Sequence, residues 1–124
     1  MYKVVVHTHF SSAHNLREYQ GVCEELHGHN WKVAVQVAAG ELDRLGLVID
    51  FKVLKKEVKA VIQRLDHKYL NNIPPFDTLN PSSENIACYI FQELKKTINN
   101  QKIRVIEVTV WESDSSGAYT RALS

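Results

Sequence analysis

The sequence predicts an α+β fold in which a largely antiparallel, four-stranded sheet carries two helices on one face. Stretches near both ends alternate apolar and polar residues with the period of a strand, and two central stretches space apolar residues as in a helix. The resulting order is strand, strand, helix, helix, strand, strand, which is typical of this class. With 124 residues, 44% of them hydrophobic, we expect a single domain spanning 1–124.

The first two strands are predicted at residues 2–10 and 30–39, the second ending at Gly40. The segment between them is expected to be a loop that carries His14 and Cys23. The apolar residues that share one face are Val4, Val6 and Phe10 in the first strand, and Trp31, Val33, Val35 and Val37 in the second.

The helices follow. Asp50 is a plausible N-cap for a first helix, and residues 80–84 supply capping groups, an early proline and an acidic first turn for a second. Residues 71–81 hold three prolines without a period, which predicts a loop. The buried stripes are expected to be Phe51, Leu54, Val58, Ile62 and Leu65 in the first helix, and Ile86, Ile90, Leu94 and Ile98 in the second.

The last two strands are predicted at 102–112 and 118–123. A sheet of this size has open edges, which proteins commonly manage by oligomerisation, covering or charge. Trp31 and Trp111 would suit a subunit interface as well as a core.

Composition narrows the classes of function. A net charge of +1, from 15 Lys and Arg against 14 Asp and Glu, gives no general attraction for nucleic acid or an anionic membrane. Apolar runs fall short of a membrane span, and the N-terminus lacks a signal-peptide layout, so we expect a cytoplasmic protein. Cys23 and Cys88 are expected to be free thiols rather than a disulfide, with Cys88 a small buried hydrophobe.

The pair His27-Gly28-His29 is the sharpest local feature of the sequence. Two imidazoles at i and i+2 of an extended chain project to the same side and can chelate one ion, and Gly28 removes bulk between them. A catalytic zinc site commonly has three protein ligands and one open position, and His14 is a candidate third ligand. His7 and His9 have the same spacing and are rivals.

Further residues offer chemistry with more than one interpretation. Cys23 is either a fourth ligand closing a structural zinc site or a reactive thiolate beside the metal. Asp66 beside His67 suits proton transfer near neutral pH, or a histidine placed against a helix dipole. Glu112 shares the parity of apolar residues, so it lies at an exposed strand end or is buried to accept hydrogen bonds from a ligand.

Taken together, these residues resemble the 6-pyruvoyltetrahydropterin and 6-carboxytetrahydropterin synthase family. The matching segments, in order, are Phe10-Ser-Ser-Ala-His14, Cys23-Glu-Glu-Leu-His27-Gly-His29-Asn30, Ile49-Asp50-Phe51, Leu65-Asp66-His67-Lys-Tyr-Leu-Asn71, Asn80-Pro-Ser-Ser-Glu84 and Glu112. The resemblance implies a tunnelling fold, with the two helices on an antiparallel sheet, assembled as a hexamer from two trimers with active sites at subunit interfaces.

The resemblance also implies the roles of the residues. His14, His27 and His29 match zinc ligands, Cys23 matches the catalytic cysteine, and Asp66 with His67 matches a second proton-transfer pair. Glu112 matches the glutamate that anchors the pterin ring, and Phe51, Ser83 and Glu84 are expected to contact substrate. For a triphosphate the sequence offers Lys52, Lys68, Arg17 and Arg121 without ranking them.

The expected activity is conversion of 7,8-dihydroneopterin triphosphate to 6-carboxy-5,6,7,8-tetrahydropterin, with release of acetaldehyde and triphosphate, as in queuosine biosynthesis. Glu24 beside Cys23 is similar to family members that cleave dihydroneopterin to 6-hydroxymethyl-dihydropterin for folate, so that product and the 6-pyruvoyl product are the alternatives. A zinc-stabilised binding module without catalysis is another class of function. A nucleic-acid-binding module is a further one, which the neutral charge disfavours.

Overall fold

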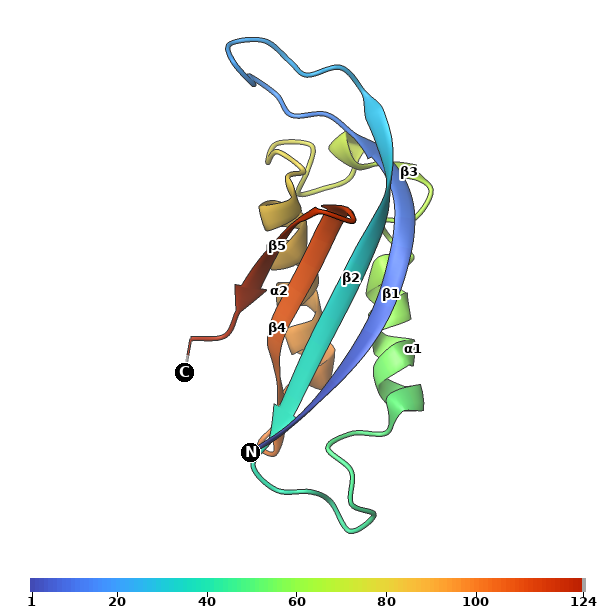
Figure 1. Cartoon of the computed structure of the whole chain (residues 1–124), viewed down its shortest axis with the longest axis vertical. Helices are drawn as coiled ribbons and strands as arrows, with labels where there is room; N and C mark the ends of the chain where they lie inside the picture. Colours follow the sequence, from blue (N-terminus) through green and yellow to red (C-terminus); the bar gives the residue numbers. More distant parts are fainter. Residues whose placement is uncertain (124) are drawn as a thin grey trace.

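The computed structural model describes residues 1–123 of the chain. Its sheet has five strands in the order β3-β1-β2-β4-β5, and all neighbouring pairs are antiparallel except β3 and β1 (Figure 1). The strands are β1 (Tyr2–His14), β2 (His27–Ala39), β3 (Lys68–Tyr69), β4 (Ile103–Ser113) and β5 (Ser116–Arg121). The predicted fold class is therefore confirmed, with β3 as a short additional edge strand.

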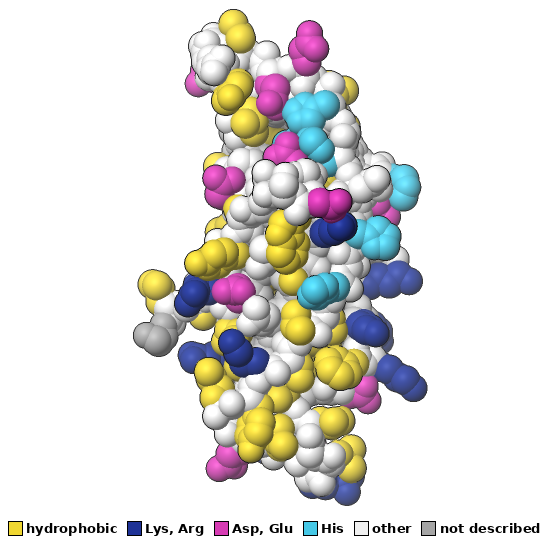
Figure 2. All heavy atoms as spheres, in the orientation of Figure 1, with side chains coloured by type: hydrophobic (Ala, Val, Ile, Leu, Met, Phe, Trp, Pro, Cys, Tyr) yellow, Lys and Arg dark blue, Asp and Glu magenta, His cyan; other side chains and the backbone are white. Residues whose placement is uncertain are grey.

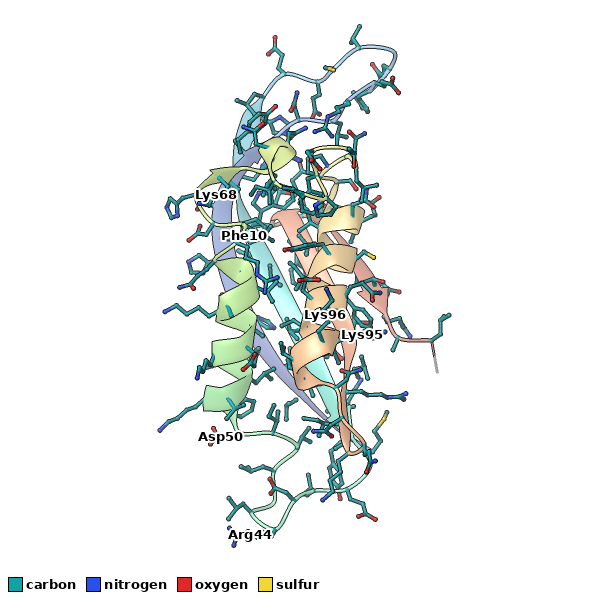
Figure 3. The ribbon with its side chains drawn as sticks, turned by 180° about the vertical axis from the view of Figure 1, so that it is seen from behind. Phe10, Arg44, Asp50, Lys68, Lys95 and Lys96 are labelled. Atoms are coloured by element: carbon teal, nitrogen blue, oxygen red, sulfur yellow. The ribbon has the colours of Figure 1, made fainter. Side chains whose placement is uncertain are left out.

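Two helices, α1 (Phe51–Ile62) and α2 (Ser83–Ile98), lie side by side on one face of the sheet, with the 3₁₀ turn η1 (Leu70–Asn72) between them in sequence (Figure 3). Asp50 caps α1 by accepting a hydrogen bond from the backbone N–H of Lys52, and Ser82 caps α2 through that of Asn85. The helices end at Ile62 and Ile98, so Leu65 is buried from a turn beyond α1.

The core fills the space between the helices and the sheet. Phe10 stacks on Trp31 with ring centroids 5.8 Å apart, and Trp31 is fully buried. Of the apolar stripe predicted for the first helix, Leu54, Val58 and Ile62 are buried, whereas Phe51 is half exposed because it begins the helix at its outer end. Aliphatic residues of α2 and β4 complete this layer, among them Ile86, Ile90, Leu94, Val108 and Val110.

The first two strands are longer than the sequence predicted. Their antiparallel ladder continues through the pair His14↔His27, so His14 is the last residue of β1 rather than part of a loop. Residues 11–13 carry no apolar alternation, and their strand conformation is set by pairing with β2. Likewise β5 begins at Ser116 because Gly117 pairs with Trp111.

No helix within residues 1–123 covers the second face of the sheet (Figure 1). Exposed apolar side chains lie on this face among basic and histidine side chains (Figure 2). A hollow of about 890 Å³ on this face is lined by residues that include His7, His9 and Lys32. Within residues 1–123, neither helix is long and apolar enough to cross a membrane.

Candidate metal centre

Strand register brings three histidines and one glutamate together at the end of the sheet where β1 stops. His14 pairs directly with His27 across the ladder, and His29 lies two residues further along β2, on the same face. Glu112 reaches the group from β4, one residue after Trp111, which pairs with Lys32. One ligand atom from each of the four side chains lies within 4.8 Å of every other.

The imidazole rings stand nearly perpendicular to one another around a common point. The centroid of His14 lies 4.6 Å from that of His27 and 5.2 Å from that of His29, with interplanar angles of 63° and 72°. His27 and His29 are 4.6 Å apart at 89°. The rings of His14 and His29 both pack edge-on against Trp31, so the core supplies a rigid apolar floor.

Backbone carbonyls fix the orientation of two of these rings. His14 Nδ1 lies 2.7 Å from the carbonyl oxygen of Pro81, and His27 Nδ1 lies 2.9 Å from that of Glu25. A carbonyl can only accept, so each Nδ1 must carry the proton, and each Nε2 presents its lone pair to the common point. This is the arrangement by which proteins orient metal-binding histidines.

Two ring nitrogens at this centre lack a hydrogen-bond partner among the protein's own atoms. The Nε2 atoms of His14 and His29 are buried and lack a hydrogen-bond partner, which is uncommon for buried polar atoms. Burial lowers the pKa of His14 below its ordinary value, although the hydrogen bond with the Pro81 carbonyl opposes this shift, so the neutral imidazole is favoured. Three imidazoles aimed at one point, with a carboxylate beside them, form a donor set that could hold a metal ion.

The arm between β1 and β2, residues 15–26, projects beyond the sheet (Figure 1) and carries Cys23 and Glu24. Glu24 Oε1 accepts a hydrogen bond from the backbone N–H of Leu16 (3.1 Å) and lies 3.8 Å from His27 Nδ1. Cys23 is exposed and does not belong to the group of converging ligands. Glu112, rather than this cysteine, is the fourth side chain at the centre.

Two asparagines tie the base of this arm to the rest of the protein. Asn71 accepts from the backbone N–H of Asn15 (3.1 Å) and donates to its carbonyl (2.8 Å), and Asn80 pairs with the backbone of Arg17 in the same way. The Arg17 guanidinium donates to the carbonyls of Asn71 and Phe76, so it is occupied structurally and is a poor candidate for binding triphosphate. Sequence reasoning assigned no role to these contacts, because they join residues more than 50 positions apart.

The predicted proton-transfer pair lies on the outer edge of β1. His67 Nδ1 is 3.0 Å from Asp66 Oδ1, which also accepts a hydrogen bond from the backbone N–H of Ser11 (2.9 Å). That bond, followed by the charge of His67, holds the pKa of Asp66 below its usual value. His67 adopts φ +55°, an uncommon left-handed conformation for a residue with a side chain, and its ring is 83% exposed.

Other predicted residues lie apart from the histidines. Phe51 begins α1 directly after Asp50, which Figure 3 marks at the far end of the molecule from Lys68. Ser83 and exposed Glu84 form the first turn of α2, which follows the carbonyl that orients His14. Lys52 and Lys68 are exposed, and Arg121 faces Glu107.

Two expectations about local residues need correction, and the rival pair His7 and His9 can be placed. Cys88 is exposed rather than buried, because it lies off the apolar stripe of α2. A Cβ at Gly28 would meet nothing within 4 Å, so the glycine does not relieve crowding between His27 and His29. His7 and His9 are exposed on the open face and do not join the metal centre.

Comparison with known proteins agrees with this fold and centre. A model of the 6-pyruvoyl tetrahydropterin synthase family matches residues 3–122. The chain belongs to this family. The sequence resemblance is therefore confirmed, and the family acts on pterins.

Individual members of the family show how broad it is. A putative 6-carboxy-5,6,7,8-tetrahydropterin synthase of Archaeoglobus fulgidus is 39% identical over 82% of this chain and 84% of its own. A dihydroneopterin monophosphate aldolase of Pyrococcus furiosus is 34% identical over 93% of both chains. The solved structure of Caenorhabditis elegans 6-pyruvoyl tetrahydropterin synthase superposes with a TM-score of 0.84 at 27% identity, covering 98% of this chain and 96% of that one. These relatives share a fold and differ in the reaction named.

Proposed function

We propose that this chain is a zinc-dependent lyase that converts 7,8-dihydroneopterin triphosphate and water to 6-carboxy-5,6,7,8-tetrahydropterin, acetaldehyde and triphosphate. The observation that carries the proposal is the convergence of three imidazole Nε2 atoms beside a carboxylate, in a family that acts on pterins. A relative with 39% identity bears the name of this activity. The step would belong to the queuosine branch of pterin metabolism, in the cytoplasm.

Zinc is the metal that this donor set favours. Three neutral imidazoles and one oxygen suit a four-coordinate zinc ion, whereas magnesium and calcium prefer oxygen ligands throughout. His14, His27 and His29 would hold the ion. When bound, zinc would polarise oxygens of the substrate's side chain and make the adjacent C–H bond more acidic.

The proton transfers are assigned to side chains outside the ligand group. Cys23 is exposed on the arm and, as a thiolate, would remove a proton from the side-chain carbon of the pterin. His67 would serve as a second acid or base, because Asp66 fixes its ring while leaving most of it accessible. The pair needs no rearrangement to accept or donate a proton at Nε2.

The residues to which substrate contacts are assigned do not all lie together within a single chain. Glu112 would accept hydrogen bonds from the guanidine-like edge of the pterin, which presents a row of N–H donors. Phe51 begins the outer end of α1, so it would serve the same pterin only from another copy of the chain. With Ser83 and Glu84 also expected to contact substrate, this separation supports a site shared between subunits, and we propose a hexamer built from two trimers.

A second reaction is favoured by the position of Glu24. Its carboxylate is held by the Leu16 N–H and lies 3.8 Å from His27 Nδ1, the ring nitrogen that faces away from the common point, so a second potential base stands behind this histidine. Such a base suits retro-aldol cleavage of a dihydroneopterin side chain, in which the C1′–C2′ bond breaks to give 6-hydroxymethyl-7,8-dihydropterin and an aldehyde. The Pyrococcus furiosus relative is named for an aldolase reaction.

Product identification tests both reactions. Zinc-loaded protein would be mixed separately with the triphosphate and the monophosphate of dihydroneopterin, and products identified by mass spectrometry. We expect a 6-carboxy product with acetaldehyde, lost in Cys23→Ala and retained in Cys88→Ala, whose thiol is also exposed. A 6-hydroxymethyl product abolished by Glu24→Gln would favour the aldolase, and a 6-pyruvoyl product would change the reaction while keeping the site.

The non-catalytic alternative makes a different prediction. If zinc only stabilised a binding module, no pterin would turn over, and removal of the metal would unfold the domain. If the chain is an enzyme, chelation should abolish turnover while the circular dichroism of the sheet is largely retained, because the apolar core cluster between helices and sheet does not include the three histidines.

A further inference from the structure

Glu112 lies where a fourth ligand of a tetrahedral ion would stand. Its Oε1 atom is 2.9 Å from His29 Nε2 and 3.8 Å from the Nε2 atoms of both His14 and His27. Ligand atoms around tetrahedral zinc, each about 2.0–2.2 Å from the metal, are separated by roughly 3.3–3.5 Å. The oxygen therefore completes the ring of donors rather than lying beside it.

The short contact with His29 does not behave as a hydrogen bond. Although Oε1 lies 2.9 Å from His29 Nε2, that nitrogen has no hydrogen-bond partner, because the contact is not aligned with the ring. His14 Nε2 is unpartnered as well. The two nitrogens and the oxygen therefore lie close together without forming hydrogen bonds to one another, as expected of ligands to a shared ion.

The backbone around Glu112 leaves this residue room to move. The pairing of β4 with β5 shifts between Trp111, which pairs with Gly117, and Ser113, which pairs with Ser116, so Glu112 is the extra residue of a bulge. Bulges re-aim a side chain and release it from the regular ladder. The carboxylate is also partly open to solvent, with a side chain 36% accessible, close to the 34% of His27 and well above the 3% of His14.

We propose that Glu112 is a displaceable ligand: it binds the metal through Oε1 in the resting protein and leaves the metal when the pterin ring binds. This inference rests on the proposed function, because that function supplies the two partners between which the Glu112 carboxylate would exchange, the zinc ion and the pterin ring. The row of N–H donors on the pterin edge needs both carboxylate oxygens turned toward it in one plane, and a carboxylate whose Oε1 points at the ion is not free to turn in this way, so the two interactions compete. A coordination position would then open only when a pterin is present.

Competition of this kind has a thermodynamic signature. If the pterin ring removes a ligand from the metal, pterin must weaken metal binding, and the metal must weaken pterin binding by the same factor. A suitable probe is 6-methylpterin, which offers the ring's donors but no side-chain oxygen for the metal. We expect its dissociation constant to be several-fold higher for the zinc-loaded protein than for the zinc-free protein, and the zinc dissociation constant to rise by the same factor when pterin is present.

Cobalt substitution reports the ligand directly. The visible spectrum of the Co²⁺-loaded protein should change when 6-methylpterin is added, and Glu112→Gln should lack that change. The same variant should bind zinc about tenfold more weakly or worse. Glu107→Gln is the matched control, since Glu107 lies on the same strand but bonds to Gln36 on the open face, and it should behave as wild type.

The outcomes separate the two proposals. Pterin binding that leaves the Co²⁺ spectrum and the zinc affinity unchanged would overturn the displaceable ligand and leave the lyase intact. So would a crystal structure of the zinc-loaded, pterin-free protein with Glu112 turned away from the metal. Failure of 6-methylpterin to bind either form would overturn the displaceable ligand, whereas only the absence of any turnover of dihydroneopterin triphosphate would overturn the lyase.

Discussion

Asn71 anchors the arm that carries Cys23 and Glu24, and its removal should be costly. The side chain is 6% exposed and forms hydrogen bonds with both the backbone N–H and the carbonyl of Asn15, the residue after His14. Each bond contributes about 1 kcal/mol, and leaving the two backbone groups partly buried and unpaired adds to the loss. We therefore expect Asn71→Ala to lower the free energy of unfolding by about 2–4 kcal/mol.

The neighbouring residue provides the control. Asn72 is exposed in the same 3₁₀ turn, so Asn72→Ala should change the free energy of unfolding by less than about 0.5 kcal/mol. Urea denaturation of zinc-free wild type and both variants would measure the difference, at one protein concentration because assembly affects apparent stability. Asn71→Asp should fall between them, since it keeps the acceptor for Asn15 N–H but turns an oxygen toward the Asn15 carbonyl. Equal stability of the two alanine variants would refute the anchoring role.

Three further predictions concern other parts of the molecule. His14→Ala should lower bound zinc, measured by atomic absorption after dialysis, from about one ion per chain to nearly none, whereas His9→Ala should retain it. A backbone N–H of β1 holds the folded-state pKa of Asp66 below its ordinary value of 3.8. The stability that this carboxylate adds is therefore fully present above about pH 4, and it is lost as the pH falls through the folded-state pKa. The excess stability of wild type over Asp66→Asn in urea titrations should therefore shrink on acidification, and a constant difference would contradict this. Gly117→Ala should destabilise by about 1–3 kcal/mol in thermal denaturation, because its Cβ would lie 2.5 Å from a tryptophan ring atom of β4, whereas Gly40→Ala has open space and should not.

The convergence of the three histidines was predictable from the sequence because their signal is local or carried by motif, whereas their role as zinc ligands stays a prediction. His27 and His29 have the i, i+2 spacing of a strand, and the family resemblance selected His14 over His7 and His9. The parity of Glu112 with buried residues of its strand indicated the correct face. Its meeting with the histidines was not predictable, because it depends on strand register and on a bulge that only the packed sheet defines.

The missed contacts are long-range and polar. Asn71 and Asn80 stand in a proline-rich segment, where asparagine ordinarily indicates a turn, yet each pairs with backbone on the arm after β1. The expectation that Cys88 is buried could have been avoided, since it lies two residues from both Ile86 and Ile90, about 200° around the helix from each.

The pairing register of β1 with β2 places both the histidines of the metal centre and the core residues of these two strands. The pairing that buries Phe10 against Trp31 also sets His14 opposite His27, and a slip of one residue would turn every one of these side chains to the open face. The histidines therefore occupy positions where the apolar stripe of the sheet would otherwise continue. Without an ion, two buried ring nitrogens there lack partners, a cost that metal binding would remove. Metal affinity and the stability of this end of the sheet should accordingly rise and fall together, while the helix-covered core remains independent of the ion.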